Sequence, residues 1–325
     1  MRRFKNILLV MNGSDLNGPE TQRALTLARI NRARLTVVDV LQFSTFGLRL
    51  PSLNEKMLTL HRQLGDERKQ ELEKLFFELS QEIYIRCEVL LGKPFAEVIR
   101  FVQKCDCDLV IKAVEEEKRF SSILFGSTDL QLLRKCPCPV WVVKADDKAE
   151  SKKILAAVQL EAIGEEEELD ELNLQIVEIA SSMAHRENGA LHIVNAWIVF
   201  DGETLAKKFS KHYKKDVEEW VEEQRQNIAA AQLVFQRKVQ KYFKTEGLSD
   251  ISCTFHFLEG EAEEVIAGLV EGLGMDLVIM GTAARTDIAG FFVGNISEAV
   301  LRQIDISVLA VKPPGFISPV TAGGG

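Results

Sequence analysis

Short apolar runs alternate with longer amphipathic segments along the first half of the chain. The apolar runs lie at 7–11, 35–41, 83–91, 109–114 and 140–143, and helical patterns lie between them at 19–30, 51–80, 95–102 and 129–135. Several runs are continuously apolar, which is typical of parallel strands covered by helices on both faces. The pattern predicts a doubly wound, Rossmann-like α/β domain with a five-stranded parallel sheet.

The same pattern returns in the second half of the chain. Residues 108–144 and 276–312 align without a gap at an offset of 168 residues, and the polar stretch 145–151 separates the two halves. A repeat of this length indicates two copies of one domain. We therefore expect domain 1 at 1–147, domain 2 at 152–313 and a disordered tail at 314–325, since the tail has little apolar content. We expect the two domains to pack together as a pseudo-dimer within one chain.

The second copy is longer than the first, mainly around residues 205–246. Apolar residues recur there at helical spacing, which predicts one long helix or two. Packing against the domain's own sheet is the preferred interpretation. The alternative is an interface with the other domain or with a second chain, which leaves open a homodimer.

Charge and composition exclude some classes of protein. The 325 residues carry a formal net charge of −8 and are 46% hydrophobic, so the chain suits a globular protein but not a general nucleic-acid surface. No apolar run approaches the roughly 20 residues that span a bilayer. The apolar run at 7–11 is too short for a signal peptide and lacks a cleavage site, so we expect a cytoplasmic protein.

The loop that follows the fourth apolar run of each copy is the candidate binding site. Glycines in such a loop let the backbone approach a phosphate, and the next helix offers free amides at its N-terminus. The second copy carries Gly281, Ala284, Gly294 and Asn295 at the spacing of a phosphate loop. The first copy has Ala113 and Glu116 at the first two of these positions and keeps Gly126 and Ser127 at the last two.

These loops and their spacing resemble the universal stress protein family, in particular its tandem-domain members, over residues 3 to about 313. Nucleotide-binding members of that family have G-x-x-G, nine residues and then G-S/T. The resemblance is greatest in LLRKCPCPVWVVK at 132–144. It implies a cytoplasmic bacterial stress-response protein, linked to tolerance of DNA damage and to motility and adhesion, with no established enzymatic activity.

The chain departs from the nucleotide-binding pattern of the family in both copies. Glutamates at 115–117 place negative charge where a triphosphate would lie in domain 1. The acidic residue that ends the first strand in nucleotide-binding members is replaced by Asn12 and by Gln159. We therefore expect a non-enzymatic protein that binds a protein partner or a small ligand, without a cofactor. The alternative is an ATP-binding, slowly hydrolysing switch that uses domain 2 alone.

Four of the six cysteines form two C-x-C pairs, Cys105 with Cys107 and Cys136 with Cys138. They precede the fourth and fifth strands, so they could gather at one edge of the sheet and hold zinc. The preferred interpretation is buried thiols that act as small apolar residues, because structural zinc sites usually space paired cysteines by two to four residues. Reversible disulfide chemistry is a further alternative.

Apolar bulk interrupts both phosphate loops. It comprises 123–125 in the first copy and 291–293 in the second. We expect these residues to plug a former nucleotide cavity, since empty apolar volume lowers stability. The alternative is that they line a pocket for an apolar, lipid-like ligand.

Overall fold

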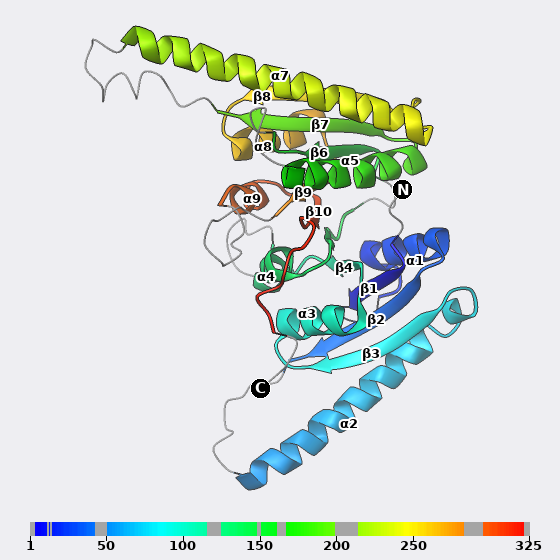
Figure 1. Cartoon of the computed structure of the whole chain (residues 1–325). Helices are drawn as coiled ribbons and strands as arrows, with labels where there is room; N and C mark the ends of the chain where they lie inside the picture. Colours follow the sequence, from blue (N-terminus) through cyan, green and yellow to red (C-terminus); the bar gives the residue numbers. More distant parts are fainter. Residues whose placement is uncertain are drawn as a thin grey trace.

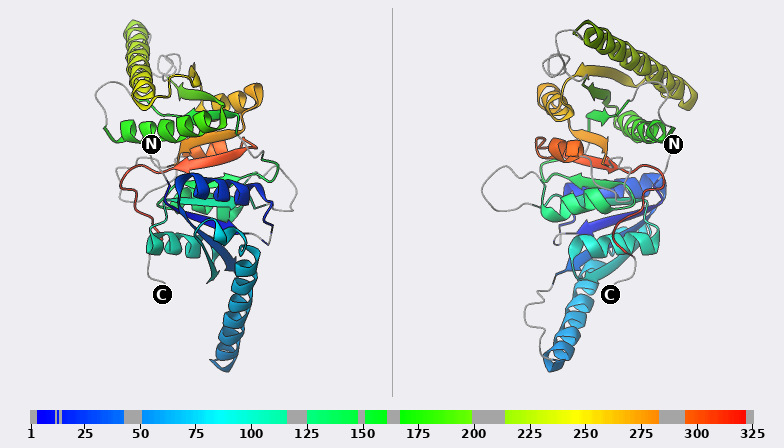
Figure 2. Two further views of the ribbon diagram at one scale, coloured as in Figure 1. Left: turned by 90° about the vertical axis from the view of Figure 1, so that its right-hand side faces the viewer. Right: turned by 60° about the vertical axis from the view of Figure 1, so that its left-hand side comes forward.

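A computed structural model of the chain describes residues 4–11, 13, 15–42, 51–115, 125–147, 151–160, 167–198, 214–282 and 295–321. All ten strands belong to one twisted sheet that runs through the length of the molecule (Figures 1 and 2). Their order is β3-β2-β1-β4-β5-β10-β9-β6-β7-β8. The first five strands belong to domain 1 and the last five to domain 2.

Domain 1 follows the predicted alternation of strands and helices. Its strands pair in parallel throughout. Its elements are β1 (Asn6–Met11), α1 (Pro19–Asn31), β2 (Arg34–Leu41), α2 (Pro51–Leu75), β3 (Ile85–Leu91), α3 (Pro94–Cys105), β4 (Leu109–Ala113), α4 (Ser127–Lys135) and β5 (Val140–Val143).

Domain 2 repeats this order, with one long helix in the insertion. Its strands are also parallel to one another. Its elements are β6 (Lys153–Ala157), α5 (Glu167–Glu187), β7 (Ala190–Trp197), α7 (Lys214–Glu246), β8 (Ser252–Glu259), α8 (Ala262–Leu273), β9 (Leu277–Gly281), α9 (Asn295–Leu301) and β10 (Ser307–Val311).

Two continuous apolar layers cover the two faces of the sheet. Buried side chains of α1, α2, α5 and α7 form one layer, and those of α3, α4, α8 and α9 form the other. The C-terminal half of α7 packs on the sheet of its own domain through the buried side chains of Phe235, Val239 and Phe243. This is the preferred interpretation of the insertion. Among the described residues, no helix is long and apolar enough to cross a membrane.

The two domains join through their last strands. β5 and β10 pair antiparallel, with Val142 opposite Val308 and Val140 opposite Ala310, and all four side chains are fully buried. The predicted pseudo-dimer is therefore one ten-stranded sheet, in which the fifth strand of each domain is the centre of the molecule rather than an edge.

Arg23 of α1 ties the polar connection between the domains to both of them. Its guanidinium lies 3.3 Å from Asp147, 3.2 Å from Glu187 of α5 and 2.8 Å from the Ser151 hydroxyl. It also lies 5.1 Å from the ring centroid of Trp141 in β5. Arg23 is only 5% exposed, so these contacts are shielded from water.

The C-terminal segment crosses back onto domain 1. The Val320 carbonyl accepts a hydrogen bond of 3.0 Å from Gln103 of α3, and the Thr321 carbonyl accepts one from Arg100. The Lys312 ammonium lies 5.0 Å from the ring centroid of Phe316. The expectation of a disordered tail from residue 314 stays a prediction; at the described end of the segment, Val320 and Thr321 contact α3 through these hydrogen bonds. Residues 322–325 lie outside the described residues.

Two histidines meet near the outer edge of domain 2. His192 Nδ1 of β7 lies 3.0 Å from His256 Nε2 of β8, and the two rings stack. Burial lowers the pKa of both side chains, and for His192 the neighbouring His256 and Lys153 lower it further. The folded state therefore binds fewer protons at this pair than the unfolded state does around pH 6.

We predict that replacement of Arg23 by Ala lowers the free energy of unfolding by about 3 kcal/mol, because it leaves Asp147 buried without its counter-ion and leaves Glu187 paired with Arg186. Guanidinium unfolding measures the change. Arg225→Ala is the matched control, since its ion pair with Glu259 is exposed and should contribute less than about 1 kcal/mol. Equal effects of the two substitutions would contradict the proposed role of Arg23.

We predict that the histidine pair makes the protein less stable as the pH falls below about 6.5, where the unfolded chain takes up protons first. Unfolding at pH 7.5 and 5.5 should show a larger loss for the natural chain than for a His192→Gln/His256→Gln variant. The difference should be at most about 1 kcal/mol, since both rings are partly exposed and solvent screens them. An identical pH dependence in the two proteins would rule the effect out.

Candidate functional site

The structure describes the candidate phosphate loops only in part. Gly126 is the N-cap of α4 and Ser127 its first residue. Gly281 is the last residue of β9, and α9 begins at Asn295. Ala284 and Gly294 lie outside the described residues, as does Glu116.

A buried carboxylate occupies the N-terminus of α4 in domain 1. Asp129 is fully buried and accepts hydrogen bonds from the backbone amides of Glu115, at 2.8 Å, and Gly126, at 3.1 Å. Its other oxygen lies 2.7 Å from the ammonium of Lys112, which is 1% exposed and also donates to the Ala113 carbonyl. Burial raises the pKa of Asp129, and the Lys112 ammonium opposes that shift.

This arrangement is that of an anion site already filled by the chain. An amide at the start of a helix, here that of Gly126, and a lysine are groups that bind a phosphate. Here the Asp129 carboxylate accepts from both and from the Glu115 amide in the loop after β4. A second anion would have to displace it and leave Asp129 buried without its partners. At the two amides described, domain 1 is therefore closed to a phosphate by the chain's own carboxylate.

Glu115 adds to the closure by packing over Gly126. A Cβ atom on Gly126 would lie 2.6 Å from Glu115 Cβ, so glycine here admits the Glu115 side chain rather than a ligand. The Glu115 carboxylate also lies 3.4 Å from the Lys112 ammonium. Phe125, 2% exposed, fills the adjoining core as the expected plug would, whereas the other predicted plug residues lie outside the described residues.

The end of the first strand in domain 1 is held by a further arginine. Arg68 of α2 donates to Asp39 of β2 at 2.7 Å and to the Gly13 carbonyl at 2.6 Å. Its contact with Glu71 makes a second ion pair. Asn12 itself lies outside the described residues. The contact to Gly13 ties the first loop of the domain to α2 and to the second strand.

Domain 2 has no equivalent of the buried ion pair. Met280 and Ser297 stand where domain 1 has Lys112 and Asp129, and the Ser297 hydroxyl donates to the Gly281 carbonyl at 3.1 Å. A Cβ atom on Gly281 would lie 2.9 Å from Leu172 Cδ2, so a larger residue here would displace the end of the Leu172 side chain of α5. Close packing against α5 thus favours a small residue at this position independently of phosphate.

An asparagine holds the first loop of domain 2. Asn173 of α5 accepts from the Gln159 amide at 3.0 Å and donates to the Gln159 carbonyl at 2.6 Å. Both backbone polar groups of Gln159, the residue that replaces the acidic residue of the family pattern, are thus paired within the chain.

Two of the four paired cysteines lie in contact just before β5. Cys136 and Cys138 lie 3.7 Å apart, sulfur to sulfur, and both are buried. Burial raises the pKa of Cys107 to about 12, with smaller contributions from Cys105 and Cys136. In the described part of the chain, no group of three or more His, Cys, Asp or Glu side chains is placed to hold a metal ion.

A lysine of domain 2, which no sequence pattern indicated, contacts the C-terminus of α4 in domain 1. The buried Lys312 ammonium donates to the Leu133 carbonyl at 2.5 Å, the Arg134 carbonyl at 3.2 Å and the Thr282 hydroxyl at 2.5 Å. Burial lowers the pKa of Lys312 to about 7, and nearby Cys136 opposes the shift. The contact is structural, since it satisfies carbonyls that a helix C-terminus leaves without partners.

We predict that Asp129→Ser lowers the free energy of unfolding by about 3 kcal/mol, because Lys112 loses its buried counter-ion and keeps only the partly exposed Glu115, at 3.4 Å. The double variant Lys112→Met/Asp129→Ser, which installs the residues of domain 2, should recover to within about 1 kcal/mol of the natural chain. Guanidinium unfolding compares the three proteins. A single variant as stable as the double variant would contradict the buried pair.

Sequence comparison identifies the family over both domains. The sequence profile of the universal stress protein family matches residues 3–144 and 151–312. The chain is similar to the universal stress protein E homolog of Haemophilus influenzae, with 28% identity over 96% of this chain and 98% of the relative. It is likewise similar to universal stress protein E of Escherichia coli K12, with 28% identity over 98% of each chain.

Solved structures share the fold across both domains. A crystal structure from Pseudomonas aeruginosa UCBPP-PA14, assigned to the universal stress proteins, superimposes with a TM-score of 0.66 at 23% identity and covers 95% of this chain and 94% of its own. A universal stress protein from Archaeoglobus fulgidus gives a TM-score of 0.56 at 17% identity and covers 95% and 98%. With the two profile matches, these findings show that the chain belongs to the universal stress protein family and carries two of its domains in tandem.

Proposed function

We propose that this chain acts in the cytoplasm as a non-enzymatic stress-response protein, in tolerance of stress such as DNA damage, by binding a protein partner or a small ligand. Family membership supports the stress-response role. The observation that carries the non-catalytic part is the Asp129 carboxylate, which accepts from the amides of Glu115, after β4, and Gly126, at the start of α4. Amides that the chain's own carboxylate already satisfies offer a triphosphate little binding energy.

A second candidate function is an ATP-binding switch in domain 2. The observation that favours it is the pair Met280 and Ser297, which leaves this loop without the internal ion pair of domain 1. The residues proposed to hold ATP are Gly281, Ala284, Gly294 and Asn295. A third candidate, an apolar-ligand carrier, would retain lipid in native mass spectra; the buried Phe125 supports a filled core instead.

We predict that calorimetric titration with Mg-ATP gives no saturable binding to the natural chain below a dissociation constant of about 1 mM, a binding free energy of about −4 kcal/mol. Gly294→Val serves as the matched variant for the loop of domain 2, and circular dichroism checks that it folds. Micromolar binding that Gly294→Val abolishes would overturn the leading proposal and establish the switch. Micromolar binding that Gly294→Val leaves intact would overturn both.

A further inference from the structure

A hollow of about 480 Å³ opens in domain 1 at the end of the sheet where β2 and β3 begin. It lies at the opposite end of the strands from the loop after β4, so it is separate from the phosphate loop described above. Its floor is apolar, and its rim is charged and aromatic. The lining residues are Ala28, Arg29, Arg32, Ala33, Arg34, Glu82, Ile83 and Tyr84.

The hollow concentrates positive charge on an acidic protein. Arg29 is paired with Glu82 at 2.8 Å. Arg32 and Arg34 are exposed, and the described part of the chain offers neither of them a carboxylate within ion-pair distance. Three guanidinium groups thus face one carboxylate, in a chain whose net charge is −8. An anion bound here would balance the excess positive charge.

Domain 2 shows which of these residues the fold itself requires. At the equivalent place His185 and Asp250 lie 3.7 Å apart, so the pair of Arg29 and Glu82 has a counterpart. This pair joins the first helix of each domain to the segment before its third strand. It belongs to the architecture of the domain and does not by itself indicate a ligand.

The remaining rim residues have no counterpart in domain 2. Leu35 pairs with Ile85 in domain 1 as Leu191 pairs with Cys253 in domain 2, which fixes the correspondence. Where domain 1 has Arg32, Arg34 and Tyr84, domain 2 has Asn188, Ala190 and Ser252. The same fold therefore forms without two arginines and a tyrosine at these positions.

Arg32 is also an unfavourable residue for its backbone conformation. It ends α1 in the left-handed region, with φ of 49° and ψ of 50°, and Asn188 has φ of 48° at the same place in domain 2. Asparagine tolerates this conformation, whereas a long side chain is disfavoured there. Domain 1 thus has an arginine at a position where domain 2 has asparagine, the residue that suits this backbone conformation better.

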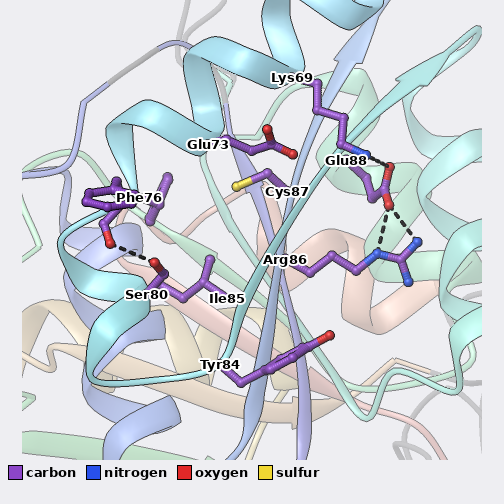
Figure 3. A pocket seen from close by; sticks show the side chains of 10 residues that line it. Lys69, Glu73, Phe76, Ser80, Tyr84, Ile85, Arg86, Cys87 and Glu88 are labelled. Carbon is purple, nitrogen blue, oxygen red and sulfur yellow. Dashed lines mark hydrogen bonds and ion pairs between the residues drawn. The ribbon is translucent and has the colours of Figure 1, made fainter.

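Tyr84 supplies an exposed ring beside these arginines. Its side chain is 64% exposed, and its carbonyl accepts from the amide of Leu35, next to Arg34. On the other side of Tyr84 lies a second hollow, of about 370 Å³, shown in Figure 3. There the cations are already paired, because Lys69 and Arg86 both converge on Glu88. Of these two hollows, the first is therefore the one in which arginines lack a carboxylate partner among the described residues.

We propose that the hollow of Arg32, Arg34 and Tyr84 binds the phosphate group of a small ligand whose ring lies on Tyr84. The planar fork of a guanidinium matches phosphate oxygens in pairs, and an aromatic ring offers a flat apolar face. The volume lies within the roughly 300–1,000 Å³ of small-molecule sites. The inference rests on the proposed function in taking the chain as a ligand-binding protein, and it names the chemical class of that ligand.

Calorimetry with phenyl phosphate and inorganic phosphate at low salt tests the site. Phenyl phosphate should bind more tightly than inorganic phosphate. The variant Arg32→Asn/Arg34→Ala, which carries the residues of domain 2, should weaken both by at least roughly tenfold, since it removes charge-assisted hydrogen bonds. Tyr84→Ser should weaken phenyl phosphate and leave inorganic phosphate unchanged.

Two controls separate a binding role from a structural one. Arg32→Asn should keep or raise the melting temperature, by roughly 2 °C, so that loss of binding is not loss of fold. The exposed Arg225→Ala should bind both probes as the natural chain does. Equal affinity of the natural chain and Arg32→Asn/Arg34→Ala, or no saturable binding of phenyl phosphate, would overturn the proposal and leave the Mg-ATP result unaffected.

Discussion

The antiparallel pairing of β5 with β10 is the constraint on which the rest of the structure depends. It converts the last strand of each domain from an edge into the centre of a ten-stranded sheet, and it places the apolar layers of the two domains end to end. Because the pairing buries both strands, polar groups near it must be satisfied across the junction. Arg23 and Lys312 do so, one on the connecting segment and one at the end of α4. The duplicated chain is thus its own dimer partner.

The two domains differ in the residues at the end of the fourth strand and the start of the fourth helix. Domain 1 fills its anion site with Asp129 and neutralises the carboxylate with Lys112, whereas domain 2 has Ser297 and Met280. A buried ion pair adds little stability compared with apolar residues of the same size, so stability alone does not account for its presence. Its clearest physical effect is to occupy the amides that would bind phosphate. The two domains therefore differ in chemistry although they share one fold.

Much of the fold follows from the sequence, and less of the site does. Continuous apolar runs and the offset between the copies predicted the strands, their parallel pairing and the tandem family fold. Lys112 lay unnoticed within a predicted strand, and Asp129 could have been found as the acidic residue three positions after Gly126, where a helix N-terminus favours it. The sequence pattern does not show that Lys312 donates to a carbonyl of α4 or that Gln103 donates to the Val320 carbonyl, because these contacts join segments far apart in the chain.

The central claim is that the Asp129 carboxylate occupies the phosphate position of domain 1. Nuclear magnetic resonance of the backbone amides of Glu115 and Gly126 during titration with Mg-ATP tests it most directly, because these two amides donate to Asp129. The account predicts that both resonances stay unchanged to millimolar ATP in the natural chain. A saturable shift of either resonance would show that ATP reaches these amides, and it would contradict the claim.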